Sequence, residues 1–400
     1  MPAGNIREFF GNDSEQLREA GAAAYIGKEG KDTPPYLIAY TDDDIFSLAQ
    51  QATGFYSLFL QHHLPAVLVE QPGRTHPTKT SGINEKLKGA DDVLGPAMKS
   101  FLQSVLAGTF GATDSAVWPE KGAAQPDIQV VKDLRYDDST GSDPKLNALD
   151  LYLPAGGQDV PLVFYVHGGG WRAGDKANPT TLVNTLGRMR VGLASINYRL
   201  APGVRHPGQI EDVARAFAWV YNNASQYRID RNRIVILGAS AGGHLVSLLA
   251  LNPEYLSKQG VPSEAIKAVA SVSGIYDLAA WPEPGLIPTR KEQAFGIDPA
   301  VLRDASPASY VTAKAPPFLI TFTDWDLFMI RENTLEMYGR MLDKGAPVQL
   351  VMVPGRNHMG IAEIGTNANQ IDDVLGPALA RFVAEQLHLL HPMNSLAMAQ

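Results

Sequence analysis

The sequence predicts an α/β fold built on a doubly wound, mostly parallel sheet. From about residue 127 onward, strand-like runs alternate with helix-like runs. Several of the strand-like runs are continuous and rich in β-branched residues, which is typical of strands buried on both faces. Regular alternation of strands and helices favours a parallel sheet with helices packed on its two faces.

The individual elements can be assigned in chain order. The predicted strands are Ile128–Leu134, Leu149–Leu153, Leu162–Val166, Leu193–Tyr198, Arg233–Leu237, Ala268–Val272, Phe318–Phe322 and Val348–Val353. The predicted helices are His206–Asn223, Gly242–Leu251, Arg331–Lys344 and Gln370–Leu387. We therefore expect one domain over 127–390, preceded by a linker at 104–126 that contains Gly, Ala and Pro without periodicity, and followed by a flexible tail at 391–400.

The composition excludes several classes of protein. The chain has 400 residues and no cysteine, so disulfides, thiolate metal sites and a cysteine nucleophile are ruled out. The net charge is −8 and the sequence has no run of Lys or Arg, so it does not predict a basic surface that would bind nucleic acid. No apolar stretch approaches the roughly 18 residues that span a bilayer, and the first residues lack a signal-peptide pattern. We expect a cytoplasmic protein, with a secreted mature form as the alternative.

The first hundred residues repeat the last hundred. Between residues 34–76 and 316–358, at a constant offset of 282, 17 of the 43 aligned positions are identical. The best-matched pairs are PPYLIAYTDDD with PPFLITFTDWD, PGRTH with PGRNH, and two copies of DDVLGPA that are one residue out of that register. A two-copy repeat with so long a period is not a solenoid. The sequence therefore predicts that residues 1–103 are a partial duplicate of the segment 295–384.

The sharpest motif is Gly238-Ala239-Ser240-Ala241-Gly242. It follows the apolar strand RIVIL and opens an apolar helix. A serine at a tight strand-to-helix turn needs small neighbours, and the turn holds its hydroxyl out at the carboxyl end of the sheet. The pattern predicts that Ser240 is a nucleophile, whereas a plain Gly-rich turn is the competing interpretation.

A glycine-rich loop, His167-Gly168-Gly169-Gly170-Trp171, directly follows the predicted strand PLVFYV. Three glycines allow backbone N–H groups to turn toward a bound carbonyl and to stabilise an oxyanion. The predicted donors are Gly168, Gly169 and Ala241, which is the residue after the serine. A phosphate-binding loop would need a different spacing to its lysine. His167 is interpreted as a brace for the loop.

A serine nucleophile needs a base, and the base needs an orienting carboxylate. Asp326 follows the strand FLITF, and His358 follows the strand VQLVMV. This order of serine, acid and histidine predicts Asp326 as the acid and His358 as the base, with Asp324 as the competitor for the acid. The N-terminal repeat has Asp44 and His76 at the matching places but no serine motif, so the C-terminal copy is expected to complete the site.

Together, HGGGW, YRLAP at 198–202 and GASAGGH at 238–244 resemble the hormone-sensitive-lipase-like carboxylesterases over residues 127–388. Within that family the chain is most similar to the bacterial branch of feruloyl and acetyl esterases. The resemblance implies an α/β-hydrolase fold and a Ser-His-Asp mechanism without a cofactor, with Ser240, His358 and Asp326 in those roles. It also implies structural roles for YRLAP and Asp212. An N-terminal repeat is not part of the family pattern.

The predicted function is hydrolysis of short-chain or aromatic acyl esters through an acyl-enzyme. An arylformamidase or amidase with the same triad is one alternative, and a non-catalytic binding module is another. Trp171, Trp325 and Phe328 could line a substrate pocket, although core packing explains aromatic residues equally well. No metal is expected because no metal-binding spacing occurs. The expected partner is a small ester substrate, and a homodimer is possible through exchange of the repeated segments.

Overall fold

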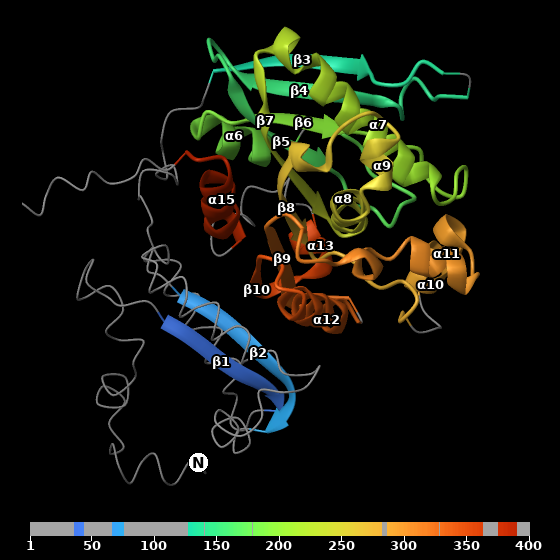
Figure 1. The fold of residues 1–400 in the computed structure, drawn as a ribbon, viewed down its shortest axis with the longest axis vertical. Coiled ribbons are helices and arrows are strands. Elements are labelled where there is room, and N and C mark those ends of the chain that lie inside the picture. Colours follow the sequence, from blue (N-terminus) through green and yellow to red (C-terminus); the bar gives the residue numbers. More distant parts are fainter. Residues whose placement is uncertain are drawn as a thin grey trace, which may run out of the picture.

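The structure of the chain is a computed structural model, and its main body spans the last two-thirds of the sequence (Figure 1). The described residues are 36–43, 66–75, 127–139, 141–177, 179–281, 286–327, 329–362 and 375–389. The predicted linker at 104–126, the tail at 391–400, Phe328 and most of the N-terminal repeat lie outside them.

Among the described residues, the main body holds an eight-stranded sheet with the order β10-β9-β8-β7-β5-β6-β4-β3. The strands are β3 (Ile128–Arg135), β4 (Ala148–Pro154), β5 (Val160–Val166), β6 (Gly192–Ile196), β7 (Ile229–Ala239), β8 (Ile266–Val272), β9 (Phe318–Trp325) and β10 (Val348–Asn357). All eight predicted strands are confirmed. The pairs β3–β4 and β4–β6 are antiparallel and the remaining pairs are parallel, so the sheet is mostly parallel, as predicted.

Helices flank the sheet on both sides (Figure 1). They are α6 (Thr180–Arg188), α7 (Gly208–Asn223), α8 (Ala241–Leu251), α9 (Glu254–Ser257), α10 (Leu286–Phe295), α11 (Pro299–Asp304), α12 (Ile330–Asp343), α13 (His358–Ala362) and α15 (Leu375–Gln386). Four of these were predicted, namely α7, α8, α12 and α15. Figure 1 shows α6 and α15 on one side of the sheet and α7, α8 and α9 on the other. Within the described segments no helix is both long and apolar enough to cross a membrane.

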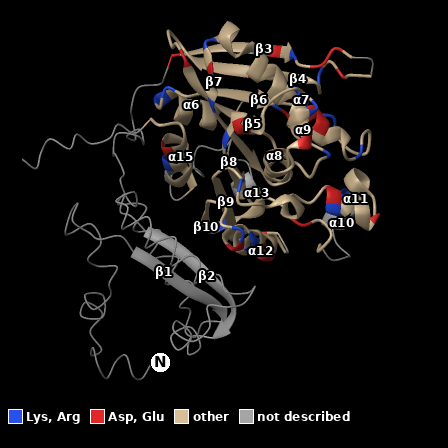
Figure 2. Cartoon of the chain, viewed as in Figure 1, with Lys and Arg blue, Asp and Glu red and all other residues tan. Residues whose placement is uncertain are grey.

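The core lies between these layers. Every residue of β4, β5 and β6 is buried, which agrees with their mostly apolar sequences. Helix α8 is buried on nearly all sides, and it lies directly behind the turn that carries Ser240. Charged residues lie mainly on the outer helices and loops, and the central strands are largely uncharged (Figure 2). The turn at Ser240 is therefore held between a rigid strand and a rigid helix.

Two further strands, β1 (Tyr36–Asp43) and β2 (Ala66–Thr75), form a separate parallel pair. Tyr36 pairs with Ala66, as Phe318 pairs with Val348 in β9 and β10. At the other end Asp43 pairs with Thr75, as Trp325 pairs with Asn357, and both ladders shift register just before that last pair. The β1–β2 ladder thus has the pairing register of β9–β10, at the offset of 282 found in the sequence.

Candidate active site

Ser240 lies at the tight turn between β7 and α8 in a strained backbone conformation, with φ 54° and ψ −120°. Such a conformation in a non-glycine residue costs about 1–3 kcal/mol. A Cβ on Gly238 would lie 2.3 Å from the carbonyl oxygen of Gly242, and a Cβ on Gly242 would lie 2.1 Å from that of Val166. Only glycine fits at these two positions, which explains why the motif has that composition.

His358 and Asp326 complete a chain of polar contacts that begins at Ser240. The Nε2 atom of His358 lies 2.8 Å from Ser240 Oγ, and its Nδ1 atom lies 2.5 Å from Asp326 Oδ1. All three side chains are largely buried. Since the carboxylate faces Nδ1, the proton of a neutral imidazole belongs on Nδ1, and the Nε2 lone pair faces the serine hydroxyl.

Three donors hold the carboxylate of Asp326. Ser273 Oγ donates to Oδ2 at 2.7 Å, the backbone N–H of Thr323 donates to Oδ2 at 3.1 Å, and that of Leu327 donates to Oδ1 at 2.9 Å. Asp324, the predicted competitor, lies in β9, and its side chain is outside the described residues, as is that of Trp325. The contribution of Ser273 was not predicted, because it comes from the end of β8, 53 residues away.

The glycine-rich loop leaves β5 and passes beside the serine turn. A Cβ on Gly168 would lie 3.4 Å from Ser240 Cβ, so the loop and the serine turn are in contact. Gly169 and Gly170 have φ values of 111° and 61°, which glycine adopts readily. Among the described residues, the N–H groups of Gly168 and Gly169 donate to no backbone carbonyl. The N–H of Ala241 is at the first turn of α8, where helix N–H groups have no intrahelical partner. These are the three predicted donors.

His167 supports the glycine-rich loop through its ring contacts, as predicted. Its ring stacks on Tyr198 with the ring centroids 4.5 Å apart, and its Nδ1 lies 2.7 Å from the carbonyl oxygen of Gly168. Burial lowers the pKa of His167, which keeps the imidazole neutral. A Cβ on Gly174 would lie 2.0 Å from His167 Nδ1, so the loop closes tightly around this ring.

A second buried histidine, His244, joins the loop to helix α8. Trp171 is buried, and its Nε1–H donates to Nδ1 of His244 at 3.2 Å. The Nε2 atom of His244 lies 2.7 Å from the carbonyl oxygen of Ala305. Phe295 packs edge-on against both rings. Burial lowers the pKa of His244 to about 3, so it is a neutral acceptor for the indole N–H. Trp171 thus has the packing of a core side chain.

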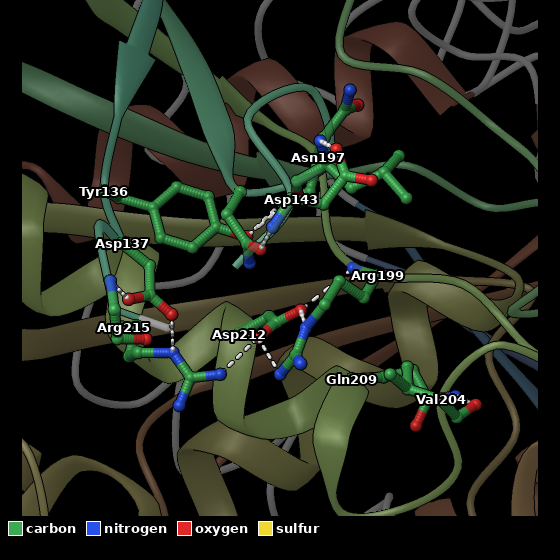
Figure 3. A network of polar contacts seen from close by, with 12 residues as sticks. Tyr136, Asp137, Asp143, Asn197, Arg199, Val204, Gln209, Asp212 and Arg215 are labelled. Atoms are coloured by element: carbon green, nitrogen blue, oxygen red, sulfur yellow. Dashed lines mark hydrogen bonds and ion pairs between the residues drawn. The ribbon is translucent and has the colours of Figure 1, made fainter. Parts of the chain in front are cut away.

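A network of charged residues anchors the loop that follows β6 (Figure 3). The fully buried Asp212 of α7 accepts two hydrogen bonds from the Arg199 guanidinium, each 2.8 Å long. Arg215 also contacts Asp212, and its Nε lies 3.0 Å from Asp137 (Figure 3). The same loop reaches the site, because the N–H of Ala201 donates to the carbonyl oxygen of Trp171 at 2.8 Å. These contacts agree with the structural role that the family resemblance implies for Asp212.

Among the described residues, no group of three His, Asp or Glu side chains could hold a metal ion. The groups that meet at Ser240 are a hydroxyl, an imidazole and a carboxylate, with backbone N–H groups of the glycine-rich loop beside them. This combination is suited to acyl transfer.

The chain is similar to known esterases. It is 30% identical over 280 residues to the esterase LipC of Mycobacterium tuberculosis, a match that covers 64% of this chain and 68% of LipC. The chain belongs to the hormone-sensitive-lipase-like carboxylesterases. A family model described as BD-FAE matches residues 149–341 of this esterase. The probable carboxylic ester hydrolase LipM, from the same organism, is 33% identical over 212 residues, which are 48% of each chain.

Solved structures agree on the fold of this carboxylesterase. A truncated carbohydrate esterase from gut microbiota is 23% identical with a TM-score of 0.56, and the match covers 67% of this chain and all of that one. Esterase B from Lactobacillus rhamnosis is 23% identical with a TM-score of 0.56, and the match covers 73% of this chain and 96% of that one. At this identity the similarity supports the α/β-hydrolase fold.

Proposed function

We propose that Ser240 is the nucleophile of this carboxylesterase, His358 its general base and Asp326 the orienting acid, and that hydrolysis passes through an acyl-enzyme. The observation that carries the proposal is the continuous contact from Ser240 Oγ to His358 Nε2, at 2.8 Å, and from His358 Nδ1 to Asp326, at 2.5 Å. Both distances are within hydrogen-bonding range, which proton transfer requires.

In the first stage Ser240 Oγ attacks the ester carbonyl carbon while His358 Nε2 takes the hydroxyl proton. The carbonyl oxygen becomes an oxyanion, which accepts hydrogen bonds from the N–H groups of Gly168, Gly169 and Ala241. One such donor contributes about 3–4 kcal/mol to the transition state. The intermediate collapses when the bond to the alcohol oxygen breaks and His358 returns its proton to that oxygen. Asp326 stabilises the imidazolium throughout.

In the second stage water hydrolyses the acyl-enzyme. His358 takes a proton from the water as the water oxygen attacks the acyl carbon. The second oxyanion occupies the same donors, and its collapse releases the acid and returns the proton to Ser240. No cofactor is needed, because each proton that leaves the serine or the water is carried by the same imidazole.

The test is hydrolysis of p-nitrophenyl acetate by the purified full-length protein, followed in a stopped-flow instrument. We expect a burst of p-nitrophenol equal to the enzyme concentration, which disappears in Ser240→Ala. Ser247→Ala is the matched control, because Ser247 is a buried serine of α8, the helix that Ser240 precedes, and its hydroxyl donates to the carbonyl oxygen of Gly243. Full activity in Ser240→Ala would refute the proposal.

We also propose that the substrates are short-chain or aromatic acyl esters, as in the feruloyl and acetyl esterase branch. The BD-FAE match and the paired motifs HGGGW and GASAGGH support this assignment. A panel of p-nitrophenyl esters of increasing acyl length, together with methyl ferulate, tests it. Preference for long acyl chains would contradict it. Faster turnover of N-formylkynurenine than of every ester would favour the arylformamidase alternative.

We further propose that residues 1–103 are a partial duplicate of the C-terminal segment, joined by the linker 104–126 to a catalytic domain at 127–390. The sequence repeat and the common register of β1–β2 and β9–β10 support it. In this proposal the C-terminal copy serves Ser240. Activity should therefore be lost in His358→Ala and kept in His76→Ala, and the reverse result would assign the base to the N-terminal copy.

A further inference from the structure

One side chain outside the triad connects the carboxylate of Asp326 to a neighbouring strand. Two of the three donors to this carboxylate, the N–H groups of Thr323 and Leu327, lie within three residues of it and belong to the same turn. The third donor, the hydroxyl of Ser273, is 53 residues away and donates to Oδ2 at 2.7 Å. Apart from His358, Ser273 is therefore the side chain in the described part of the chain that fixes this carboxylate from a distant segment.

Ser273 lies between the strand of the serine turn and the strand of the acid. It follows the last residue of β8, and the neighbours of β8 in the sheet are β7 and β9. On one side the N–H of Ser240 donates to the carbonyl oxygen of Val272 at 2.8 Å. On the other side the N–H of Ser273 donates to the carbonyl oxygen of Thr321 at 2.9 Å. The backbone at the end of β8 therefore sets the spacing between Ser240 and the strand that leads to Asp326.

The backbone of Ser273 is held in a costly conformation. Its φ of 45° lies in the left-handed region, which a serine keeps only where the surrounding structure fixes it. The segment that follows is fixed to helix α12, because the N–H groups of Tyr276 and Asp277 both donate to Asn333 Oδ1, at 2.6 and 3.1 Å. The side chain of Ser273 is completely buried. Its hydroxyl is therefore presented to Asp326 from a rigid support.

We propose that Ser273 is a positioning residue for ester hydrolysis and that it acts through Asp326. The proposal deepens the proposed function and rests on it, since there Asp326 orients His358. A carboxylate turns about its Cβ–Cγ bond, and without Ser273 the donor left to Oδ2 among the described residues is the N–H of Thr323, at 3.1 Å. The Ser273 hydroxyl holds Oδ2 in place, which leaves Oδ1 facing Nδ1 of His358. The opposite ring nitrogen of His358 then stays directed at Ser240.

The same hydrogen bond stabilises the charge of the acid. The side chain of Asp326 is 2% exposed, so its negative charge depends on protein donors rather than on water. A hydroxyl that donates to a carboxylate makes a charge-assisted hydrogen bond, which is stronger than one between neutral groups. The imidazolium that forms on His358 during the reaction is stabilised by this negative charge. Removal of the Ser273 hydroxyl should therefore slow acylation about 10- to 100-fold.

A double-mutant cycle in the full-length protein tests whether Ser273 acts through Asp326. The four proteins are the wild type, Ser273→Ala, Asp326→Asn and the double variant. Acylation is measured in single turnovers of p-nitrophenyl acetate with enzyme in excess, so that a slow variant is compared on the same scale as a fast one. The dependence on enzyme concentration separates the maximal rate constant from the half-saturating concentration.

We expect Ser273→Ala to lower the maximal rate constant about 10- to 100-fold and to change the half-saturating concentration less than about twofold. The second expectation follows because Ser273 contacts the acid and not the substrate. In the Asp326→Asn background the same substitution should change the rate constant less than about threefold, since the carboxylate through which Ser273 acts is already absent. A purely structural role would lower the rate by the same factor in both backgrounds.

Two further variants separate the hydroxyl from the fold. Ser195→Ala is the matched control, because Ser195 is a fully buried serine of β6 whose hydroxyl donates to the carbonyl oxygen of Lys176 at 2.8 Å. Its removal should leave the rate constant unchanged. Ser273→Gly removes the same hydroxyl as Ser273→Ala but accepts a positive φ without strain. It should show the same fall in rate, and it keeps the test available if Ser273→Ala does not fold.

The outcomes separate this proposal from the proposed function. A wild-type rate constant in Ser273→Ala or in Ser273→Gly would overturn the positioning role, and so would an equal fall with and without the carboxylate of Asp326. If Asp326→Asn is strongly impaired while Ser273→Ala is not, only the positioning role is refuted. If Asp326→Asn acylates as fast as the wild type, the assignment of the acid fails, and the role of Ser273 fails with it.

Discussion

His244 should make the stability of this esterase sensitive to acid. Its ring is completely buried and neutral, with Nδ1 accepting from Trp171 and Nε2 at the carbonyl oxygen of Ala305. Burial lowers the pKa of His244 from 6.5 to about 3. Protonation of Nδ1 would remove the acceptor for the indole N–H and place a charge in the buried interior. The folded state therefore resists protonation where the unfolded chain does not.

The size of the effect follows from this difference in pKa. Between pH 6.5 and 3 the unfolded chain binds a proton that the folded chain excludes, so stability falls as the pH falls. The slope approaches about 1.4 kcal/mol per pH unit. From pH 7.5 to 5.0 the loss from His244 alone is about 2 kcal/mol. At higher pH both states are neutral at this residue, and the contribution is constant.

Urea unfolding of the wild type and of His244→Gln at pH 7.5 and 5.0 measures this loss. Glutamine does not titrate, so the variant should lose about 2 kcal/mol less than the wild type over this interval. The comparison is a difference of differences, and any loss of packing in the variant cancels. His388→Gln is the matched control, because it makes the same substitution at an exposed histidine. Equal losses in the wild type and His244→Gln would refute the reasoning.

Three further predictions concern the loop, the acid and a buried ion pair. Gly169→Ala should lower kcat/KM for p-nitrophenyl acetate about 100-fold or more. The φ angle of Gly169 is +111°, and the new Cβ would lie 2.1 Å from the carbonyl oxygen of Ala173. Unchanged kinetics would contradict the assignment of this loop as the oxyanion donor. Asp326→Asn should lower kcat by about 10³–10⁴, while Asp324→Asn stays near wild type, and stopped-flow kinetics of both variants decide between them. Lys176→Met should lower the free energy of unfolding, measured in urea, by about 3–5 kcal/mol. The substitution leaves the buried carboxylate of Asp150, 2.6 Å from Lys176 Nζ, without its cation. A loss below about 1 kcal/mol would show that other groups satisfy Asp150.

The strands were predictable because a strand that is buried on both faces consists of consecutive apolar residues. The fully buried β5 is a continuous apolar run, and a run of that kind between turn residues predicts a central strand without further information. Helices α6, α9, α10, α11 and α13 were not predicted. Short helices that are held by tertiary contacts carry few residues in which a periodic pattern can be seen.

The local parts of the site were predictable for a related reason. The turn at Ser240 and the loop at Gly168–Gly170 are contiguous motifs. A Cβ at Gly168, Gly169, Gly238 or Gly242 would clash with the backbone of the same turn or loop or of an adjacent strand. His167 was assigned as a brace from its place in the loop, and its stacking on Tyr198 confirms this interpretation. The pocket roles of Trp325 and Phe328 stay predictions.

Two buried hydrogen bonds between distant segments, outside the Ser240–His358–Asp326 chain, were not predicted. His244 and Trp171 are 73 residues apart, and Ser273 and Asp326 are 53 apart. Each side chain alone has an ordinary interpretation, as a helix residue, a pocket aromatic or a strand-end serine. Only the packing of α8 against the sheet, and of β8 beside β9, turns them into hydrogen-bonded pairs.

The sequence by itself determined the fold class, the turn at Ser240, the glycine-rich loop at Gly168–Gly170 and the order of Ser240, Asp326 and His358 along the chain, because these depend on adjacent residues. The tertiary structure decided which side chains meet: Ser240 with His358, the carboxylate of Asp326 with Ser273, and the buried indole with His244. The physical reason is that such contacts depend on strand order and helix packing, which sum weak interactions over the whole domain.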